Sequence, residues 1–448
     1  MRRAAGLALA VALILRAAPA AAQPCADCLA AGAARVSLGV PAGAPLAGYG
    51  SFARRLLLPD VLGRHAHAFW FRPAEGARDA LAARALVLQS GEARLAWVTI
   101  DLVAVDRSFT AEVERRLAAA GMRPATLIVS ASHTHSGPGA FVDSAVLGWL
   151  ATDRLDGDVR DALVATAVAA VQQADAGRQP ARVGAGSVTA SGVATSRLGE
   201  ALDEELAVLK VVTAAGAPLA IVWNYAIHGT ALGPRNRRLS GDVMGEASRR
   251  LEQALGVPAL FVNGAVGDVS PAGHGERATT DLGARLAESA RAAWARSEPI
   301  ASPTLGAGRL DVSLPSPSLS LRNCLRGWVP AALGLPLGSV FPRETTLTAV
   351  ALGDVGWVTF PGELQTRLGM GIKQRRGPRL KRTLLAGVSN DYLGYFLTAA
   401  DYGRPSYISC STVYGPNVGT CLAAAAGGLL GAVAGGDRPS GARLSCDR

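Results

Sequence analysis

Hydrophobic and polar positions alternate along the chain in a way that predicts strands and helices in turn. Residues 95–101 form a short apolar run typical of a strand, residues 109–120 carry apolar side chains at helical spacing, and residues 126–132 are again apolar and β-branched. The alternation recurs, with strands expected at 206–212, 218–226, 258–263, 347–352, 355–360 and 384–388, and helices at 243–255 and 281–296. We therefore expect an α/β fold in which a mixed sheet is flanked by helices.

Two stretches depart from this pattern. Residues 302–343 are rich in Pro, Ser, Gly and Leu and lack helical or strand periodicity for much of their length. A substrate lid and a plain covering of the sheet are equally compatible with such a segment. Residues 422–435 are apolar, but the run is short and rich in glycine for a membrane span, which predicts a buried C-terminal helix.

The first residues have the character of a secretion signal. Arg2 and Arg3 precede an apolar run over residues 4–15, and small residues at 17–22 offer cleavage positions. We expect residues 1–22 to be a signal peptide and the protein to be exported, either to a periplasm or outside the cell. A retained membrane anchor is the alternative.

Charge and composition exclude one class of partner. The net charge of +10 rests almost wholly on arginine in a chain rich in Ala, Gly, Leu and Arg, which indicates a general composition bias. Because no lysine-rich tail and no basic stretch interleaved with aromatics is present, we do not expect nucleic-acid binding. Weak attraction to an anionic membrane surface stays open.

The cysteines fit an oxidising compartment. All six lie beyond the expected cleavage position, and an even number in an exported protein favours disulfides; they are Cys25, Cys28, Cys324, Cys410, Cys421 and Cys446. The C-x-x-C at Cys25 and Cys28 lacks the β-α-β context of a redox motif, so we expect a terminal disulfide there. A cysteine zinc site would lack a second C-x-x-C.

Candidate chemistry begins at Ser132-His-Thr-His-Ser-Gly-Pro-Gly139, which follows the predicted strand at 126–132. If strand geometry persists through this motif, its period of two puts His133 and His135 on one face, at a strand end where open α/β sheets bind ligands. Either imidazole is then available to a metal ion. Taken alone, the pair is as consistent with two structural histidines that hydrogen-bond the loop.

Four further clusters each place polar residues after an apolar strand. They are His228-Gly229, Gly267-Asp268-Val-Ser270-Pro271, Gly362-Glu363, and Asn390-Asp-Tyr392-Leu-Gly-Tyr395. Each alone has a structural explanation, such as a core tyrosine or a hydrogen-bonded histidine. Strand ends that converge on one sheet edge would instead unite imidazole, carboxylate and phenolate, a donor set that suits zinc. A tyrosine ligand must lose its proton, and a divalent cation supplies the required shift of its pKa.

Taken in order, these motifs resemble the neutral/alkaline (non-lysosomal) ceramidase family. The resemblance rests on S-H-T-H-S-G-P-G, N-x-x-x-H-G, G-D-x-S-P, P-G-E and S-N-x-Y-x-x-Y, and it runs from Gly48-Tyr49 to Gly415-Pro416. It implies one zinc ion per chain, with ligands at His133, His228, Glu363 and Tyr395. It further implies Ser270 as the catalytic serine, His135, Arg197 and Tyr407 at the scissile amide or its oxyanion, and Gly48 facing the site with its backbone.

The activity implied by the resemblance is hydrolysis of ceramide to sphingosine and a fatty acid. Zinc would polarise the amide carbonyl, His135 would protonate the departing amine, and Arg197 and Tyr407 would stabilise the oxyanion. Whether Ser270 itself or a zinc-bound water attacks is left open. Another N-acyl lipid or N-acyl amine is the alternative substrate, and a catalytically silent lipid-binding protein is a further alternative.

Departures from the family pattern place the substrate in question. Ser270 follows His228 by 42 positions, where the family has a longer excursion, and Ala272 stands where the family usually has asparagine. We expect residues 23–448 to form a single catalytic domain without the C-terminal immunoglobulin-like module of longer members. The residues implied in the chemistry are all present, whereas the segments that shape a lipid pocket are reduced.

Overall fold

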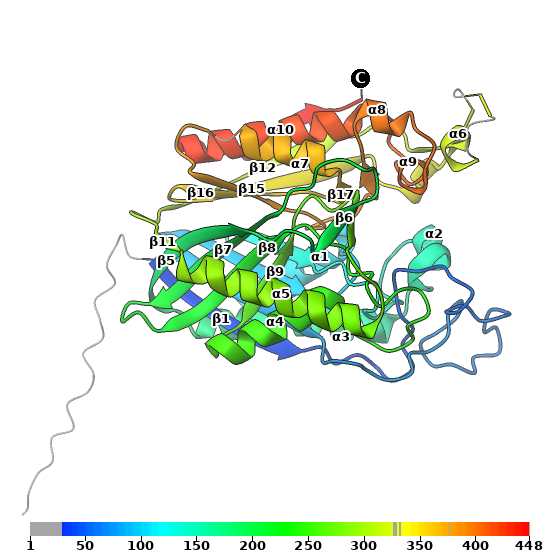
Figure 1. Cartoon of the computed structure of the whole chain (residues 1–448), viewed down its shortest axis with the longest axis horizontal. Coiled ribbons are helices and arrows are strands. Elements are labelled where there is room, and N and C mark those ends of the chain that lie inside the picture. The colour runs from blue at the N-terminus through cyan, green and yellow to red at the C-terminus, as the bar shows by residue number, and fades with distance from the viewer. Residues whose placement is uncertain (1–28, 326–328, 331–332, 376, 448) are drawn as a thin grey trace, which may run out of the picture.

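The computed structural model describes residues 29–325, 329–330, 333–375 and 377–447. Within them, two sheets pack face to face and helices cover both outer faces, giving four layers in the order α-β-β-α (Figure 1). The expected α/β fold is confirmed, with two mixed sheets flanked by helices where a single mixed sheet was expected. The expected signal peptide and the Cys25 and Cys28 pair lie outside the described residues.

The larger sheet is nine-stranded and has the order β4-β3-β2-β1-β5-β7-β8-β9, with β11 beside β5. Its strands are β1 Leu29–Ser37, β2 Ala82–Ser90, β3 Ala93–Ile100, β4 Thr126–Ala131, β5 Gln179–Thr189, β7 Glu205–Thr213, β8 Pro218–Tyr225, β9 Ala259–Asn263 and β11 Glu298–Pro299. Two pairs are parallel, β3 with β4 and β8 with β9. Helical crossovers join the strands of each parallel pair, so β4, β8 and β9 carry loops at their carboxyl ends that are free to build a site.

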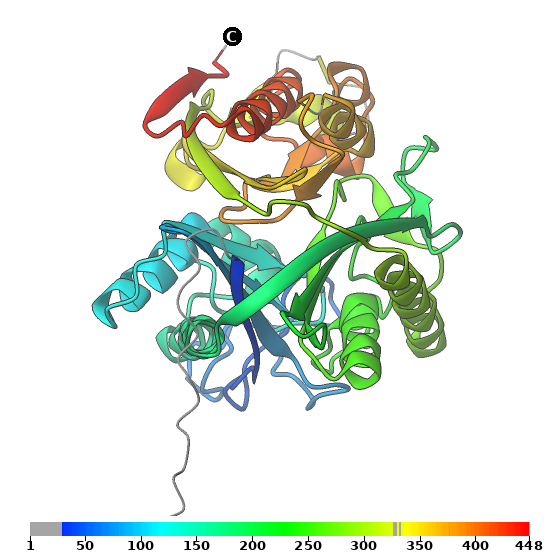
Figure 2. The ribbon, with the colours of Figure 1, turned by 90° about the vertical axis from the view of Figure 1, so that its left-hand side faces the viewer.

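Four helices cover the outer face of this sheet (Figure 2). They are α1 Arg107–Ala119 and α3 Gly157–Ala176 over β1 to β4, and α4 Asp242–Leu255 and α5 Glu276–Ala295 over β7 to β9. Helix α1 illustrates why such a segment forms a helix and packs on the sheet. Asp106 caps its first turn by accepting from the Phe109 amide, and Phe109, Val113 and Leu117 form a buried apolar stripe at helical spacing.

The smaller sheet has five strands in the order β18-β16-β15-β12-β20. Its strands are β12 Leu305–Ser313, β15 Glu344–Leu352, β16 Val355–Thr359, β18 Arg382–Ala386 and β20 Ala442–Ser445, and its outer face is covered by α7 Thr366–Gln374 and α10 Val418–Gly435. Short strand pairs and helical turns complete the fold. The strand pairs are β6 Ala194–Ser196 with β10 Val269–Pro271, β17 Glu363–Leu364 with β19 Tyr395–Phe396, and β13 Ser318–Ser320 with β14 Gly334–Pro336. The helical turns are α2 Ala145–Leu147, η1 Gly148–Thr152, α6 Leu321–Cys324, η2 Gly338–Val340, α8 Ala399–Tyr402 and α9 Tyr407–Cys410.

The inner faces of the two sheets share one hydrophobic core. At its centre Trp97 of β3 meets Trp357 of β16 edge to face, with ring centroids 5.7 Å apart, and both side chains are fully buried. Buried aromatic pairs of this geometry add to the free energy gained from their large buried area. The relative position of the sheets, and with it any site built from both, depends on this core.

The structure confirms most of the predicted elements and corrects two. Residues 302–343 contain β12, a nine-residue strand that pairs along its whole length with β15, so the expected lack of periodicity is wrong there. Gly306 and Gly308 interrupt the apolar alternation of this strand, and its exposed face carries Arg309 and Asp311. The helix expected at 281–296 begins earlier, at Glu276.

Helix α10 is long and apolar enough, by length and composition, to cross a membrane, and among the described residues it alone has this property. Half of its apolar window is buried inside the molecule, because Leu422, Ala426 and Leu430 pack on the smaller sheet. The predicted buried C-terminal helix is therefore present.

Candidate metal centre and catalytic site

Three histidines from two loops of the larger sheet come together. His133 and His135 follow β4, His228 follows β8, and a parallel bridge between Thr134 and Gly229 joins the loops. One ligand atom from each imidazole lies within 4.8 Å of the others, and all three residues are buried. Strand geometry does not persist through the motif, because β4 ends at Ala131 and His133 has a φ of 67°. The common direction of His133 and His135 thus comes from a turn.

Backbone carbonyls fix the protons on two of these rings. His133 Nδ1 lies 2.6 Å from the carbonyl of Val103, and His135 Nδ1 lies 2.9 Å from the carbonyl of Gly48. Since a carbonyl only accepts, both Nδ1 atoms carry a proton, and in a neutral ring the lone pair is then on Nε2. Within the described part of the chain no hydrogen-bond partner meets either Nε2. In the neutral form, both rings therefore direct a buried lone pair into the site, as metal ligation requires.

Glu363 brings a carboxylate to the same point from the smaller sheet. Its Oε2 lies 2.9 Å from His228 Nε2 and its Oε1 lies 3.4 Å from His133 Nε2. Burial favours the neutral acid, but the two imidazoles outweigh it and hold the pKa of Glu363 well below its usual range. Although Glu363 Oε2 lies close to the His228 ring, it makes no hydrogen bond with any described residue. Such close, unbonded approach of donor atoms is the arrangement expected of ligands that converge on a cation.

Burial favours the neutral form of His228 and His135. Together with the nearby Arg197 guanidinium, burial lowers the pKa of His228 to about 3. Burial and the neighbouring histidines lower the pKa of His135 well below its usual range. Neutral imidazole is the form that binds metal ions.

Tyrosines from the segment after β18 line the other side. Tyr395 is the register partner of Glu363 in the parallel β17–β19 pair, and its hydroxyl lies 3.5 Å from His228 Nε2 and 3.3 Å from the Tyr407 hydroxyl. Tyr392 donates to Glu363 Oε1 over 2.6 Å. Burial and the Glu363 charge raise the pKa of both Tyr392 and Tyr395 well above the usual range. Without a cation both phenols are protonated.

Arg197 connects this cluster to Ser270. The strands β6 and β10 pair with Thr195 opposite Ser270, which sets Arg197 beside the serine. Arg197 Nε donates to Ser270 Oγ over 2.7 Å, and Arg197 Nη1 lies 3.4 Å from the Tyr395 hydroxyl. The guanidinium thus bridges the serine and the tyrosine.

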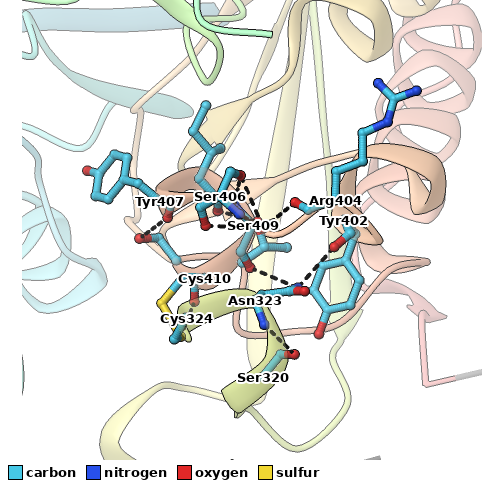
Figure 3. The surroundings of a disulfide bond; sticks show 12 residues. Ser320, Asn323, Cys324, Tyr402, Arg404, Ser406, Tyr407, Ser409 and Cys410 are labelled. Atoms are coloured by element: carbon cyan, nitrogen blue, oxygen red, sulfur yellow. Dashed lines mark hydrogen bonds between the residues drawn. A yellow bond between two sulfur atoms is a disulfide. The ribbon is translucent and has the colours of Figure 1, made fainter. Parts of the chain in front are cut away.

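Tyr407 stands on a short, covalently fixed turn (Figure 3). It begins α9, where Ser406 and Ser409 form a reciprocal capping box, and Cys410 at the end of α9 is joined to Cys324 of α6 by a disulfide. Asn323 adds a hydrogen bond of 3.0 Å to the Tyr402 carbonyl. A second disulfide joins Cys421 to Cys446. Two of the three disulfides compatible with the cysteine count are therefore in place, and the described cysteines are all bonded.

A buried amide holds both histidine loops from behind. Asn263, the last residue of β9, donates from Nδ2 to the carbonyls of Ser132 at 3.4 Å and Ile227 at 3.0 Å. Its Oδ1 accepts from the Ile227 amide at 3.2 Å. Ser132 and Ile227 directly precede His133 and His228, so Asn263 sets the spacing of these two imidazoles.

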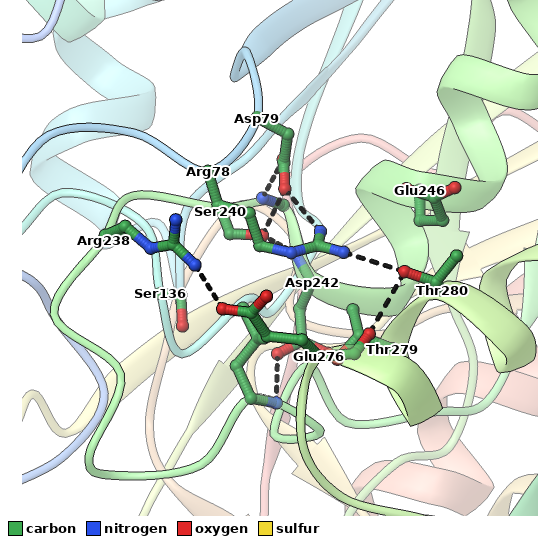
Figure 4. Close-up of polar contacts among 12 residues, drawn as sticks. Arg78, Asp79, Ser136, Arg238, Ser240, Asp242, Glu246, Glu276, Thr279 and Thr280 are labelled. Atoms are coloured by element: carbon green, nitrogen blue, oxygen red, sulfur yellow. Dashed lines mark hydrogen bonds and ion pairs between the residues drawn. The ribbon is translucent and has the colours of Figure 1, made fainter.

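A polar network supports the same loops from the helix side, and Figure 4 shows the part of it around Asp79, Ser240 and Asp242. Thr134 donates to the Ser240 carbonyl over 2.7 Å, and the Ser240 hydroxyl donates to Asp79 over 2.5 Å. Asp242 accepts from the amides of Ala231 and Leu232 in the loop after His228, at 3.2 and 3.1 Å. Burial raises the pKa of Asp242 to about 6 despite these bonds.

The nine residues singled out from the sequence lie in one network of contacts. His135 reaches Gly48 through its ring, Glu363 joins His133 and His228, and the chain of contacts continues through Tyr395 to Tyr407, Arg197 and Ser270. A cavity of about 120 Å³ opens onto this network, and its walls include Gly48, His135, Glu363, Tyr392 and Tyr407 beside apolar side chains.

Sequence reasoning missed two residues of the site. Tyr392 was visible in the N-x-Y-x-x-Y pattern, but only the second tyrosine of that pattern was assigned a part. Asn263 stands in the motif that leads to Ser270, yet nothing local marks its amide, because its partners lie in loops far away in the chain. The geometry itself establishes a buried histidine group, His133, His135 and His228, that could bind a metal ion.

Comparison with known proteins places this chain in a family. The model of the neutral/alkaline non-lysosomal ceramidase N-terminal region matches residues 67–298. A neutral ceramidase of Mycobacterium tuberculosis (strain ATCC 25618 / H37Rv) is 26% identical over 227 residues, which cover 44% of this chain and 36% of that protein. The matched part thus spans about a third of the length of this curated relative.

Two solved structures share the fold. The neutral ceramidase from Pseudomonas aeruginosa superposes with a TM-score of 0.79 at 19% identity, covering 93% of this chain and 76% of that chain. A ceramidase complexed with C2 gives a TM-score of 0.80 at 19% identity, covering 93% and 77%. The fold, the ordered motifs and the family-model match agree, and the chain belongs to the neutral/alkaline non-lysosomal ceramidase family.

Proposed function

We propose that this chain is an exported zinc-dependent amidase that hydrolyses the N-acyl bond of ceramide to sphingosine and a fatty acid. The observation that carries the proposal is the convergence of buried, unpaired imidazole and carboxylate atoms on one point, with Ser270 linked to that point through Arg197. Both sheets supply residues to the site, so we treat residues 23–448 as one catalytic unit. The two disulfides favour an extracytoplasmic location.

Zinc fits the donor set. His133, His228, Glu363 and Tyr395 would hold the ion, since Glu363 contacts both of these histidines and Tyr395 approaches His228. Nitrogen and oxygen donors with two or more imidazoles are typical of zinc sites. Ligation by Tyr395 requires loss of a proton that burial and Glu363 oppose, and the charge of a dication would offset both effects. When bound, zinc would supply Lewis-acid polarisation of the amide carbonyl.

The residues outside the zinc ligand set would act on the substrate in different ways. Arg197 donates to Ser270 Oγ, which orients the serine and places a fixed positive charge where an oxyanion would develop. His135 carries its proton on Nδ1, held by Gly48, so its Nε2 would accept the proton released by the attacking group, Ser270 or water, and pass it to the departing amine. The Tyr407 hydroxyl adds a second donor at the mouth of the cavity.

The cavity walls suit a substrate with a hydrocarbon part. Besides the polar residues, Val103, Ala104, Val142, Leu147 and Ala151 line the cavity. The relatives are named ceramidases, and one of them is described as complexed with C2. An N-acyl lipid other than ceramide would meet the same walls, and it is the second candidate substrate.

A substrate panel tests the proposal. The full chain is incubated with ceramides, N-acyl amino acids and N-acyl ethanolamines, and release of fatty acid is measured for the wild type and for His228→Ala. We expect ceramide hydrolysis by the wild type and its loss in the variant. Hydrolysis of only the other two classes would replace ceramide as the substrate, and full ceramide hydrolysis by His228→Ala would refute the site assignment.

A further inference from the structure

Five large apolar side chains project into solvent from one short loop. Phe52 is 93% exposed, Leu57 94%, Leu58 79%, Val61 74% and Leu62 71%, and we call the segment 52–62 that carries these five side chains the apolar loop. Leaving such side chains in water forgoes the free energy that their burial would supply. Single exposed leucines are ordinary, whereas a contiguous group indicates a surface that binds something.

The exposure is imposed by the fold. In the same loop the Arg54 side chain is buried and donates to the carbonyls of Ala47 at 2.8 Å and His135 at 2.7 Å. Backbone bonds from Leu56 to Trp70 and from Asp60 to Phe69 hold the loop against a neighbouring segment. The polar side chain thus points inward and the apolar ones outward, which is the reverse of a loop adapted to water.

The apolar loop continues into the mouth of the site. Arg55 donates to the carbonyls of Trp149 and Leu150 in η1, and these two side chains are 51% and 44% exposed. The next residue, Ala151, accepts from the Gly48 amide over 2.8 Å, and both Ala151 and Gly48 line the cavity. Figure 1 shows this loop and α2 at the same end of the molecule as α9, which carries Tyr407.

Charge and side-chain type identify the occupant. Because Arg54 points inward, residues 51–64 present two arginines, Arg55 and Arg64, against the single acid Asp60, so the outward-facing charge of the segment is +1 within a chain of +10. Leucine, phenylalanine and tryptophan interleaved with arginine are typical of segments that lie in a bilayer interface. A second copy of the chain would have to bury these arginines against its own, which opposes self-association through this surface.

We propose that the apolar loop, with Trp149 and Leu150, is a membrane-docking surface that inserts into the interfacial region of a lipid bilayer and sets the mouth of the site against it. The inference rests on the proposed function, because an N-acyl lipid resides in such a bilayer. An enzyme that takes its substrate from this phase gains by having the entrance of the site at the lipid surface.

Vesicle binding tests the docking surface without any substrate. The full chain is sedimented with phosphatidylcholine vesicles, with and without phosphatidylglycerol, and compared with the double variant Leu57→Ser/Leu58→Ser. We expect the double variant to bind roughly tenfold more weakly and the wild type to bind better when anionic lipid is present. Leu444→Ser, at a leucine of β20 that is 38% exposed, is the matched control and leaves binding unchanged. Residues 1–28 are identical in all three proteins.

Two readouts separate this inference from the proposed function. Thermal unfolding and hydrolysis of a soluble short-chain N-acyl amide are expected to be the same in the double variant and the wild type, while hydrolysis of a bilayer-embedded substrate falls. Equal vesicle binding by the wild type and the double variant would overturn the docking surface, as would self-association lost in the variant without vesicle binding. Intact binding without hydrolysis of any N-acyl lipid would overturn the proposed function instead.

Discussion

The two sheets bring different chemistry to one site. The loops of the larger sheet supply three imidazoles, together with Ser270 and Arg197, whereas the smaller sheet and the segment after it supply Glu363 and the tyrosines. Nitrogen donors thus come from one side of the interface and oxygen donors from the other. Neither sheet therefore builds the site alone, and the hydrophobic core between the sheets determines the geometry of the site.

The two sides are also held in different ways. The histidine loops are fixed by backbone carbonyls that accept from Asn263 and by backbone amides that donate to Asp242. On the other side, the β17–β19 pair sets Glu363 against Tyr395, and the Cys324–Cys410 disulfide fixes the turn of Tyr407. Substitutions that weaken one support at a time separate these contributions.

Trp357→Ala attacks the interface itself and is expected to have the largest effect. Removing this fully buried ring leaves a cavity beside Trp97, at a cost of about 3–5 kcal/mol in the free energy of unfolding. Urea unfolding followed by circular dichroism measures the loss. Trp149→Ala, at a half-exposed tryptophan, serves as the control, with an expected change under about 1 kcal/mol in the free energy of unfolding. Equal losses of stability in both variants would contradict a special contribution of the interface between the sheets.

Removing the Cys324–Cys410 disulfide by serine substitution of both residues tests the support of Tyr407. The sequence separation of 86 predicts a loss of about 4 kcal/mol in stability. Because α9 carries Tyr407, we also expect kcat to fall while metal content stays the same. The matching double substitution at Cys421 and Cys446, separated by 25 residues, is expected to cost about 3 kcal/mol without affecting kcat. A fall of kcat in both variants would contradict a specific role of the first disulfide.

Asn263→Asp tests the clamp behind the histidines. A carboxylate in place of the amide cannot donate to the Ser132 and Ile227 carbonyls, which leaves them unpaired at a cost of about 2–3 kcal/mol. We expect affinity for zinc, measured by calorimetric titration of the apoprotein, to fall by about 10- to 100-fold. Asn224→Asp removes an equally buried amide that bonds Val262 and Leu385 instead. Equal affinity losses in both variants would remove the case for Asn263 as a positioning residue.

Tyr392→Phe removes one hydrogen bond to Glu363 from the oxygen side and has the smallest expected effect. Loss of this bond of 2.6 Å is expected to weaken zinc binding by roughly tenfold, with little change in stability. Tyr414→Phe deletes a hydroxyl with a bond of the same length to the Pro342 carbonyl and is the control. Unchanged zinc affinity in Tyr392→Phe would show that Glu363 needs no partner to keep its orientation.

Much of the fold was predictable from the sequence, and so was the proximity of the candidate residues, whose chemical roles stay predictions. The β3-α1-β4 unit shows clear periodicity, and ordered motifs pointed to residues that the structure brings together, from His133 to Tyr395. β12 was missed because Gly306 and Gly308 conceal its alternation. The turn at His133 and the contacts of Asn263 were beyond reach, because both depend on segments that lie about 30 to 131 residues away in the chain.

The central claim is that donors from both sheets meet on one zinc ion, and metal analysis tests it most directly. The full chain and Glu363→Ala are purified without chelators, checked for folding by circular dichroism, and assayed for zinc by plasma mass spectrometry. The account predicts about one zinc ion per wild-type chain and a loss of most of it in the variant, although every histidine remains. A folded wild type without zinc, or a variant that keeps full zinc, would contradict the account.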